Sequence, residues 1–300
     1  MTPIKDFASL TAHLRESGVR KRIAVVCASD RNAEQAVVHA LEEGFADLIM
    51  VGDGDILDRF SELKRFPGRV EVIDVHDRDE AARVAVKLVR DGKADVLMKG
   101  LINTDNILRA ILDKECGILP AGRVLTHVTV AEVPGRDKLL FFSDPAVIPS
   151  PTFSQRVEQV RYLASICRSF GIECPRIALV HCSEKVNAKM PVTLDYVRLV
   201  EMNRQGDFGK AIIDGPMDVK TACEATSGAI KGIVSPIEGN ADALLFPDIE
   251  SGNVFYKTLT LWAKALNAGM LCGTSAPVVL PSRSDTAEAK YTSLAVACLM

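Results

Sequence analysis

The sequence predicts an α/β protein in which mostly parallel sheets are covered by helices. Short continuous apolar runs, such as residues 22–29, alternate with segments whose apolar residues recur at the helical spacing i, i+3, i+4. Short connections separate the two kinds of segment along most of the chain. Alternation of this kind indicates parallel strands joined by right-handed helical crossovers, with helices on both faces of a sheet.

In the first half of the chain, predicted strands and helices follow one another from residue 22 to residue 144. The strands are expected at 22–29, 46–52, 70–74, 94–100, 124–133 and 138–144. The helices are expected at 33–44, 55–65, 77–88 and 105–114. Asp77 and Glu80 have the spacing of a capping box, and Gly44 is placed to end the first of these helices.

Proline and serine interrupt the pattern over 142–152, and the alternation restarts beyond this segment. Further strands are expected at 176–182, 210–216, 241–247 and 276–280. Further helices are expected at 152–170, 191–204, 218–226, 251–266 and 285–298. A chain of 300 residues is too long for a single hydrophobic core of ordinary size. The interruption therefore predicts two α/β domains, residues 1–148 with 285–300 and residues 149–284.

The composition is that of a soluble globular protein. Hydrophobic residues make up 48% of the chain and charged residues 25%, which excludes disorder and fibrous repeats. The net charge of −3 lacks the basic excess of a nucleic-acid binder. No apolar run approaches the ~20 residues of a membrane helix, and charges interrupt the N-terminal segment where a signal peptide has its apolar centre. A cytoplasmic protein without a nucleic-acid or membrane partner is expected.

The eight cysteines and five histidines show no metal-binding spacing. The cysteines form no C-x-x-C pair, and most lie in apolar stretches, so we expect them to be reduced, buried and not catalytic. A dinucleotide site at Gly52-Asp53-Gly54 is a weak prediction because Leu57 occupies the place of the third glycine.

Ligands of parallel sheets bind beyond the carboxyl ends of the strands, and chemically suitable residues follow several predicted strands. Lys99, Asn103 and Thr104 follow the 94–100 strand. Ser282 and Arg283 lie between a strand and a helix, where amides and a guanidinium can bind a phosphate or carboxylate. A capped helix beside a surface arginine is the alternative interpretation of this segment.

Two further turns in the second half of the chain also place polar residues at the carboxyl ends of predicted strands. Asp214 ends one strand, and Asp248, Ser251 and Asn253 lie between the next strand and its helix. Either these side chains cap helices or, together with the Ser282–Arg283 turn, they form the walls of one cleft. Asp285 and Glu288 have capping-box spacing, which by itself favours a capping role over an acid–base role.

The motifs at 98–112, 139–152, 214–218, 239–257 and 281–290 resemble those of the phosphate acyltransferase family, which comprises phosphate acetyltransferases and phosphate butyryltransferases. The sequences MKGLINT and SRSDTAEAK are closer to the butyryl branch. The resemblance implies two α/β domains around a central cleft, a fold similar to the isocitrate and isopropylmalate dehydrogenases. It also implies a homodimer or higher homo-oligomer, with residues 149–284 contributing to dimerisation.

The same resemblance implies the reaction and several site residues. Members interconvert acyl-CoA plus phosphate with acyl phosphate plus CoA, without a metal or nucleotide cofactor. The paired Ser282 and Arg283 match a serine that stabilises the transition state and an arginine at the acyl phosphate or CoA site, and Arg109 matches a further arginine. The aspartate that the acetyl branch uses as a base falls on Ala289, which leaves Glu288, one residue earlier, as the candidate base.

The chemistry requires the same kinds of group. The CoA thiol must lose a proton before it attacks the acyl carbonyl, the oxyanion needs hydrogen-bond donors, and the leaving phosphate needs a cation. Direct transfer between two bound substrates needs no protein nucleophile. Three other functions remain open at this point: a phosphate acetyltransferase, a decarboxylating dehydrogenase of the related fold, and a non-catalytic acyl-CoA-binding protein.

Overall fold

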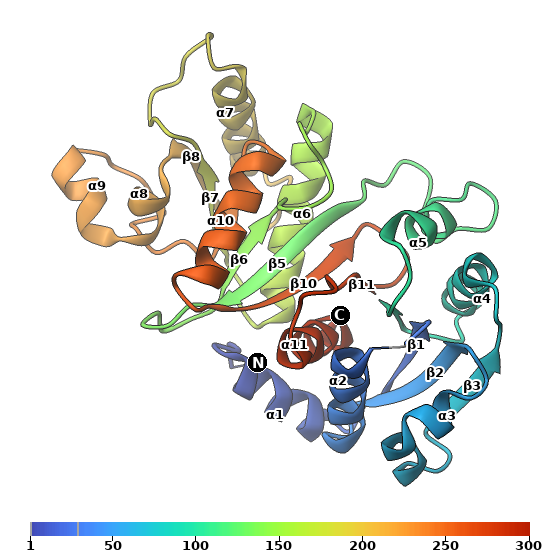
Figure 1. The fold of residues 1–300 in the computed structure, drawn as a ribbon. Helices are drawn as coiled ribbons and strands as arrows, with labels where there is room; N and C mark the ends of the chain where they lie inside the picture. Colours follow the sequence, from blue (N-terminus) through green and yellow to red (C-terminus); the bar gives the residue numbers. More distant parts are fainter. Residues whose placement is uncertain (1, 29) are drawn as a thin grey trace. The chain divides into compact units, whose positions relative to one another are not determined.

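The computed structural model describes residues 2–28 and 30–300 and shows helices alternating with strands (Figure 1). The chain divides into two compact units. Unit I contains Phe7–Leu125 and Asn267–Met300, and unit II contains Thr126–Leu266 together with the residues up to Asp6. None of the helices in the described ranges has the length and apolar character needed to span a membrane.

Unit I is built on a sheet with the strand order β3-β2-β1-β4-β11-β10. The strands are β1 (Lys21–Val26), β2 (Ala46–Gly52), β3 (Val70–Asp74), β4 (Val96–Lys99), β10 (Leu266–Cys272) and β11 (Val278–Val279). All pairs are parallel except β10 with β11. Apolar side chains such as Ile23, Val25 and Leu97 are completely buried in this sheet, as the continuous apolar runs predict.

Helices cover both faces of the unit I sheet. They are α1 (Phe7–Ser17), α2 (Arg31–Glu42), α3 (Ile56–Arg59), a 3₁₀ helix (Ser61–Arg65), α4 (Arg78–Arg90), α5 (Thr104–Ile111) and α11 (Ala287–Leu299). Helix α11 packs against α1 and α2, whereas α4 packs against α5 and lies on the other face (Figure 1). Residues 290–298 of α11 are all buried, so this helix is central to the unit I core.

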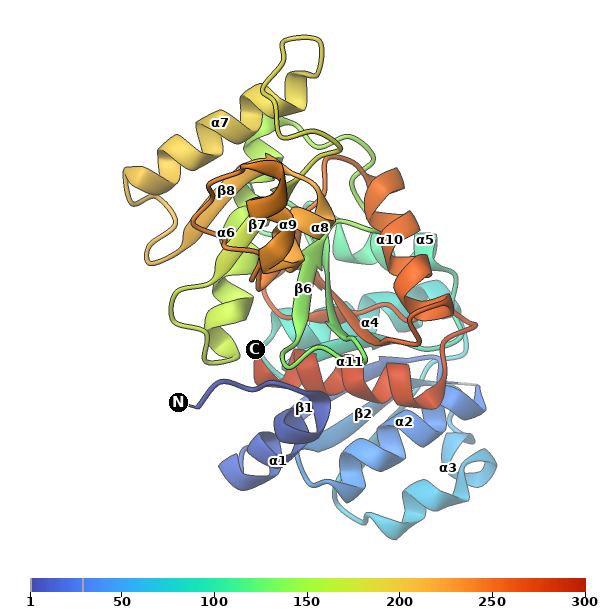
Figure 2. The same cartoon turned by 90° about the vertical axis from the view of Figure 1, so that its left-hand side faces the viewer.

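Unit II contains a sheet with the strand order β5-β6-β9-β7-β8. Its elements are β5 (Thr126–Glu132), β6 (Leu140–Ser143), α6 (Phe153–Ser169), β7 (Arg176–Val180), α7 (Pro191–Arg204), β8 (Ile212–Met217), α8 (Val219–Cys223), α9 (Ala225–Lys231), β9 (Ala243–Leu245) and α10 (Ile249–Leu261). Only β5 and β6 pair in antiparallel fashion. Phe142, Leu244 and Leu259 belong to the core under α8 and α10, while α6 and α7 cover the opposite face (Figure 2).

The two units confirm an α/β fold, but their bounds differ from the expected 1–148 with 285–300 and 149–284. Strands β5 and β6 pair with each other, and β6 pairs with β9, which places residues 126–143 in unit II. Strand β11 pairs with β4, which places residues 278–279 in unit I. Strand pairing over long sequence distances therefore divides the chain at 125/126 and 266/267.

Several individual elements also differ from the sequence prediction. Helix α1 and strand β10 had no predicted counterpart, and the segments predicted as helices at 55–65 and 218–226 are each divided in two. The last helix begins at Ala287 rather than at residue 285, because the Thr286 hydroxyl accepts a hydrogen bond from the amide of Ala289 and so caps it. Asp285 is therefore not the cap of α11.

Candidate functional site

The carboxyl ends of β1 and β4 lie against each other and position the turn that follows β4. Val26 pairs with Lys99, and the Gly100 amide donates to the Val26 carbonyl at 2.8 Å. A Cβ atom on Gly100 would stand 2.5 Å from the carbonyl oxygen of Cys27. Only glycine fits here, so the close approach of the two strands depends on Gly100.

Lys99 ends β4 with a buried ammonium group. The residue is 3% exposed, and its Nζ donates to the Gly100 carbonyl at 3.2 Å. Burial lowers the pKa of Lys99, and the charges of Arg283 and Lys290 lower it further. Lys99, Arg283 and Lys290 thus form a group of three cations, here named the cationic cluster, within unit I. Asp30 and Asp285 also lie within electrostatic range of Lys99, and Lys290 is paired with Asp30 at 2.7 Å, so an anion placed there would mainly compensate Lys99 and Arg283.

Arg283 is joined to the start of α5. Its Nη2 donates to Oδ1 of Asn103 at 2.8 Å, although 179 residues separate the two in sequence. Asn103 is the N-cap residue of α5, yet its side chain accepts no capping hydrogen bond and is used by the arginine instead. Thr104 follows it, exposed, as the first helical residue. The arrangement leaves amides at the positive end of a helix beside an exposed guanidinium, a pair of groups that attracts phosphate.

Ser282 and Arg283 belong to a turn that precedes α11, not to the first turn of that helix. The Ser282 amide donates to the Asp285 carboxylate at 2.7 Å, and the Asp285 amide donates to the Ser282 carbonyl at 3.1 Å. The Ser282 hydroxyl lies 3.0 Å from that of Ser284. The sequence predicts an anion site at the amides of the last helix. The turn contacts α5 through Asn103, and it contacts α2 through Asn32, which donates to the Asp285 carbonyl.

Two candidate residues of unit I lie apart from the contacts just described. Glu288 is exposed in the first turn of α11. Arg109 lines a cavity of about 310 Å³ between α4 and α5, together with Arg83, Lys87 and Arg90. Asp79, Glu80 and Asp113 line the same cavity, and Arg83 is paired with Glu80, so positive and negative side chains are mixed around Arg109.

The candidate residues of unit II hold the local backbone in place. The Asp248 carboxylate caps α10 by accepting from the amide and the hydroxyl of Ser251, at 2.8 and 2.7 Å. Asn253 donates to the Pro145 carbonyl at 3.0 Å, and Asp214 accepts from the Ser235 hydroxyl at 2.6 Å. These contacts agree with the helix-capping alternative for Asp248 and Ser251. A substrate-binding role of the four residues remains a prediction.

Asp144 is a structurally important residue that the sequence interpretation missed. It is 2% exposed, and its carboxylate accepts hydrogen bonds from the Thr126 hydroxyl and from the amides of residues 127, 146, 147 and 148. The carbonyls of Pro145 and Pro149 in turn accept from Asn253 and from the Ile249 amide at the start of α10. The Ser-Asp-Pro sequence was the available signal, because aspartate before such a turn binds amides of its own loop.

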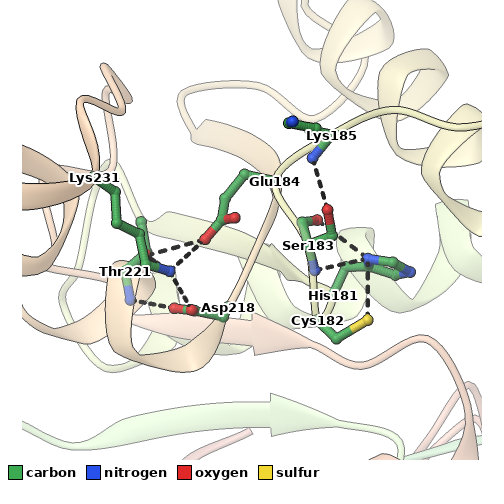
Figure 3. Close-up of polar contacts among 8 residues, drawn as sticks. All are labelled: His181, Cys182, Ser183, Glu184, Lys185, Asp218, Thr221 and Lys231. Carbon is green, nitrogen blue, oxygen red and sulfur yellow. Dashed lines mark hydrogen bonds and ion pairs between the residues drawn. The ribbon is translucent and has the colours of Figure 1, made fainter.

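A second polar group lies at the carboxyl ends of β7 and β8 (Figure 3). The Lys231 ammonium is paired with Glu184 at 2.6 Å and with Asp218, and it lies 3.2 Å from the Thr221 hydroxyl. The hydrogen bonds that the Lys231 ammonium donates to Asp218 and Glu184 raise the pKa of Lys231. The Lys231 ammonium thus bridges two carboxylates, and these contacts join α9 to the loop after β7 and to the start of α8.

Beside that group, the Nδ1 atom of His181 lies 3.1 Å from both the amide nitrogen and the carbonyl oxygen of Ser183 (Figure 3). His181 is 8% exposed. No grouping of three or more His, Cys, Asp or Glu side chains suited to a metal ion occurs within 2–28 and 30–300.

The cysteines are all free, but their burial differs from the sequence prediction. Cys116, Cys174 and Cys182 are exposed, because they lie in loops and at the ends of elements. Cys167 and Cys298 are buried, and burial raises the pKa of Cys298 to about 12. A thiol with so high a pKa is a poor nucleophile at neutral pH.

Comparison with known proteins places this chain among acyltransferases. Residues 76–298 match the family described as Phosphate acetyl/butaryl transferase. A phosphate butyryltransferase of Clostridium beijerinckii is 38% identical over 297 residues, covering 99% of this chain and 98% of the relative. A phosphate acetyltransferase of Thermotoga maritima is 36% identical over 283 residues, covering 94% of this chain and 96% of the relative.

The fold has a counterpart among solved structures. A branched-chain phosphotransacylase from Enterococcus faecalis superimposes with a TM-score of 0.82 at 31% identity, covering 93% of this chain and 98% of that one. The resemblance in sequence and the resemblance in structure therefore lead to the same group of proteins.

Proposed function

The chain belongs to the phosphate acetyl/butyryl transferase family, and from this membership we propose that it transfers a short acyl group between coenzyme A and inorganic phosphate. In one direction the thiol sulfur of CoA attacks the carbonyl carbon of an acyl phosphate. A C–S bond forms, the C–O bond to phosphate breaks, and phosphate leaves while the thiol proton passes to a base. The reverse direction consumes acyl-CoA and phosphate.

The cationic cluster is the observation that supports this proposal. Arg283 presents a planar guanidinium beside the start of α5, and the Lys99 ammonium lies buried within electrostatic range of it. Such groups hold the phosphoryl oxygens and stabilise the charge that the leaving phosphate develops. The hydroxyl of Ser282, on the same turn as Arg283, supplies a donor for the oxyanion. Glu288 is proposed as the base for the thiol.

The remaining proposed contacts concern the larger parts of the substrate. Asn103, Thr104 and Arg109 are proposed to bind phosphate or CoA from α5. Asp214, Asp248, Ser251 and Asn253 of unit II are proposed as substrate-binding residues. No resident cofactor is proposed, because CoA enters as a substrate and the transfer is direct.

A thiol-release assay tests the proposed reaction. The enzyme is mixed with butyryl-CoA, with and without inorganic phosphate, and free thiol is followed with a chromogenic disulfide. Thiol release that requires phosphate supports the acyltransferase. Release without phosphate, or no release while acyl-CoA still binds, contradicts it and favours a hydrolase or a non-catalytic acyl-CoA-binding protein.

The same assay gives the first prediction, which concerns chain length. Four-carbon acyl-CoA esters are expected to be preferred over acetyl-CoA in kcat/KM, in line with the butyryl-like motifs at 98–104 and 282–290. One methylene in an apolar pocket contributes about 1–3 kcal/mol, or ~10- to 200-fold, and butyryl exceeds acetyl by two, so a preference of at least ~10-fold is expected. An acetyl-CoA kcat/KM equal to or above the butyryl-CoA value would contradict this preference and leave the family membership unchanged.

A second prediction concerns the cysteines. Single replacement of each of the eight cysteines by alanine is expected to leave at least about a tenth of kcat/KM, because direct transfer needs no protein thiol. The thiol-release assay measures the activity, and circular dichroism checks the fold. A thousandfold loss at one position in a folded variant would instead indicate a covalent acyl-enzyme.

We also propose that the protein acts in the cytoplasm as a homodimer or higher homo-oligomer. Exposed apolar side chains on α10 and just after it support association: Val254 is 65% exposed, Leu261 59% and Trp262 76%. Sedimentation equilibrium of the wild type and of Trp262→Asp tests this. A monomeric wild type would contradict it.

A further inference from the structure

The turn that carries Ser282 and Arg283 is supported from behind by the start of α2. Asn32 donates from Nδ2 to the carbonyl oxygen of Asp285 at 3.1 Å. Asp285 closes the turn by accepting from the Ser282 amide. The position of the turn therefore depends on where α2 begins relative to the turn and to α11.

A buried ion pair fixes α11 to the same end of α2. Lys290 is 2% exposed, and its Nζ lies 2.7 Å from Oδ1 of Asp30. The same carboxylate oxygen accepts from the amide of Ala33 at 2.9 Å and so caps α2. Tyr291, the residue after Lys290 in α11, stacks on His39 of α2 with ring centroids 3.9 Å apart. Asp30 is thus at once the cap of α2 and the anchor of α11.

The ion pair between Lys290 and Asp30 also bears on whether Asp30 is available to pair with Lys99. Within the part of the chain that the structure describes, Lys99 forms no ion pair, although Asp30 and Asp285 both lie within electrostatic range of it. Asp30 is engaged by Lys290, and Asp285 is engaged by the Ser282 amide. Because both carboxylates have other partners, neither competes with an arriving anion for the Lys99 ammonium.

We propose that Lys290 is a positioning residue of the phosphate site: its ion pair with Asp30 fixes the turn that carries Arg283 and prevents Asp30 from pairing with Lys99. The inference rests on the proposed function, because it assigns phosphate as the anion. Lys290 acts through its neighbours and does not itself contact the reacting atoms. Without it, Asp30 becomes the carboxylate that neutralises Lys99.

The test compares three proteins: the wild type, Lys290→Met, and the double variant Lys290→Met/Asp30→Asn. Methionine is a flexible, unbranched side chain without the charge, and asparagine is as good an N-cap as aspartate. For Lys290→Met we expect the Kd for inorganic phosphate, measured by calorimetry, and the KM for phosphate to rise at least about tenfold, with kcat changed less. For the double variant we expect at least half of that rise in log Kd to be recovered, because the competing carboxylate is gone.

Lys138→Met is the matched control. Lys138 pairs with the buried carboxylate of Asp242 at 2.5 Å in unit II, so the substitution removes a comparable ion pair from elsewhere. It is expected to lower Tm without changing the phosphate Kd. If Lys290→Met does not fold, Lys290→Gln replaces it, since glutamine still hydrogen-bonds to Asp30 but leaves its charge uncompensated.

Two results would overturn the inference. One is a Lys290 variant with the wild-type phosphate Kd. The other is a double variant that binds phosphate no better than the single variant, which would reduce Lys290 to a purely structural role. Failure of the proposed function is separate, because it is seen as a wild type that binds phosphate but shows no phosphate-dependent thiol release.

Discussion

Arg283→Ala is expected to lower kcat/KM for phosphate or acyl phosphate by about 10²-fold or more. The guanidinium faces the start of α5, where its contact with Asn103 holds it beside the positive end of the helix. Alanine removes both the positive charge and the bidentate hydrogen bonds to the phosphoryl oxygens. Steady-state kinetics with phosphate as the varied substrate measure the effect.

Arg283→Lys separates charge from shape. Lysine keeps the positive charge but lacks the planar pair of donors. The kcat/KM of this variant for phosphate is therefore expected to lie clearly below that of the wild type and above that of Arg283→Ala. Tm is expected to change little in either variant, since Arg283 is exposed. Arg65→Ala, which removes an exposed arginine paired with Glu42, is the control and should retain full activity. Near-normal turnover of Arg283→Ala would show that Arg283 is not needed to bind phosphate and would leave Lys99 and Arg109 as the candidate cations.

Asp144→Ala is expected to produce the largest loss of stability. The buried carboxylate accepts five hydrogen bonds, four of them from backbone amides that alanine would leave without a partner. Removing one member of a buried, hydrogen-bonded charge site costs about 3–5 kcal/mol. Urea unfolding followed by fluorescence and circular dichroism measures the free energy of unfolding.

Two controls make this result specific. Asp144→Asn retains one acceptor and the shape of the side chain, so it is expected to be less destabilising than alanine. Asp137→Ala removes an exposed carboxylate from the preceding loop and should change the free energy of unfolding by less than about 0.5 kcal/mol. If the free energy of unfolding of Asp144→Ala equals that of the wild type, water or other groups must accept the hydrogen bonds of the loop amides.

The regular elements of this protein were largely predictable because their signals are local. The strand at 46–52 and the helix at 191–204 have the same bounds in the prediction and in the structure. Helix α1 also had a readable signal, since Phe7, Leu10 and Leu14 recur at helical spacing and are buried. Strand β10 had none, because Asn267 and Gly269 interrupt its apolar run.

The candidate site was predictable in part. Lys99, Asn103 and Arg283 were chosen because they follow predicted strands, and the structure brings them together in unit I. Lys290 and Asp30 were not chosen, because a lysine one turn into a helix and an aspartate at a helix start have ordinary surface roles in a sequence. Only the packing of α11 against α2 shows that the Lys290 ammonium is buried.

By itself, the sequence determined the alternation of strands and helices, the residues placed at strand ends, and the family resemblance. These depend on apolar periodicity and on short motifs, which neighbouring residues specify. The tertiary structure decided the bounds of the two units, the pairing of β11 with β4, the contact of Arg283 with Asn103 and the partner of Lys290. Each of these joins residues at least 100 positions apart, and such contacts depend on how whole elements pack to bury their apolar faces.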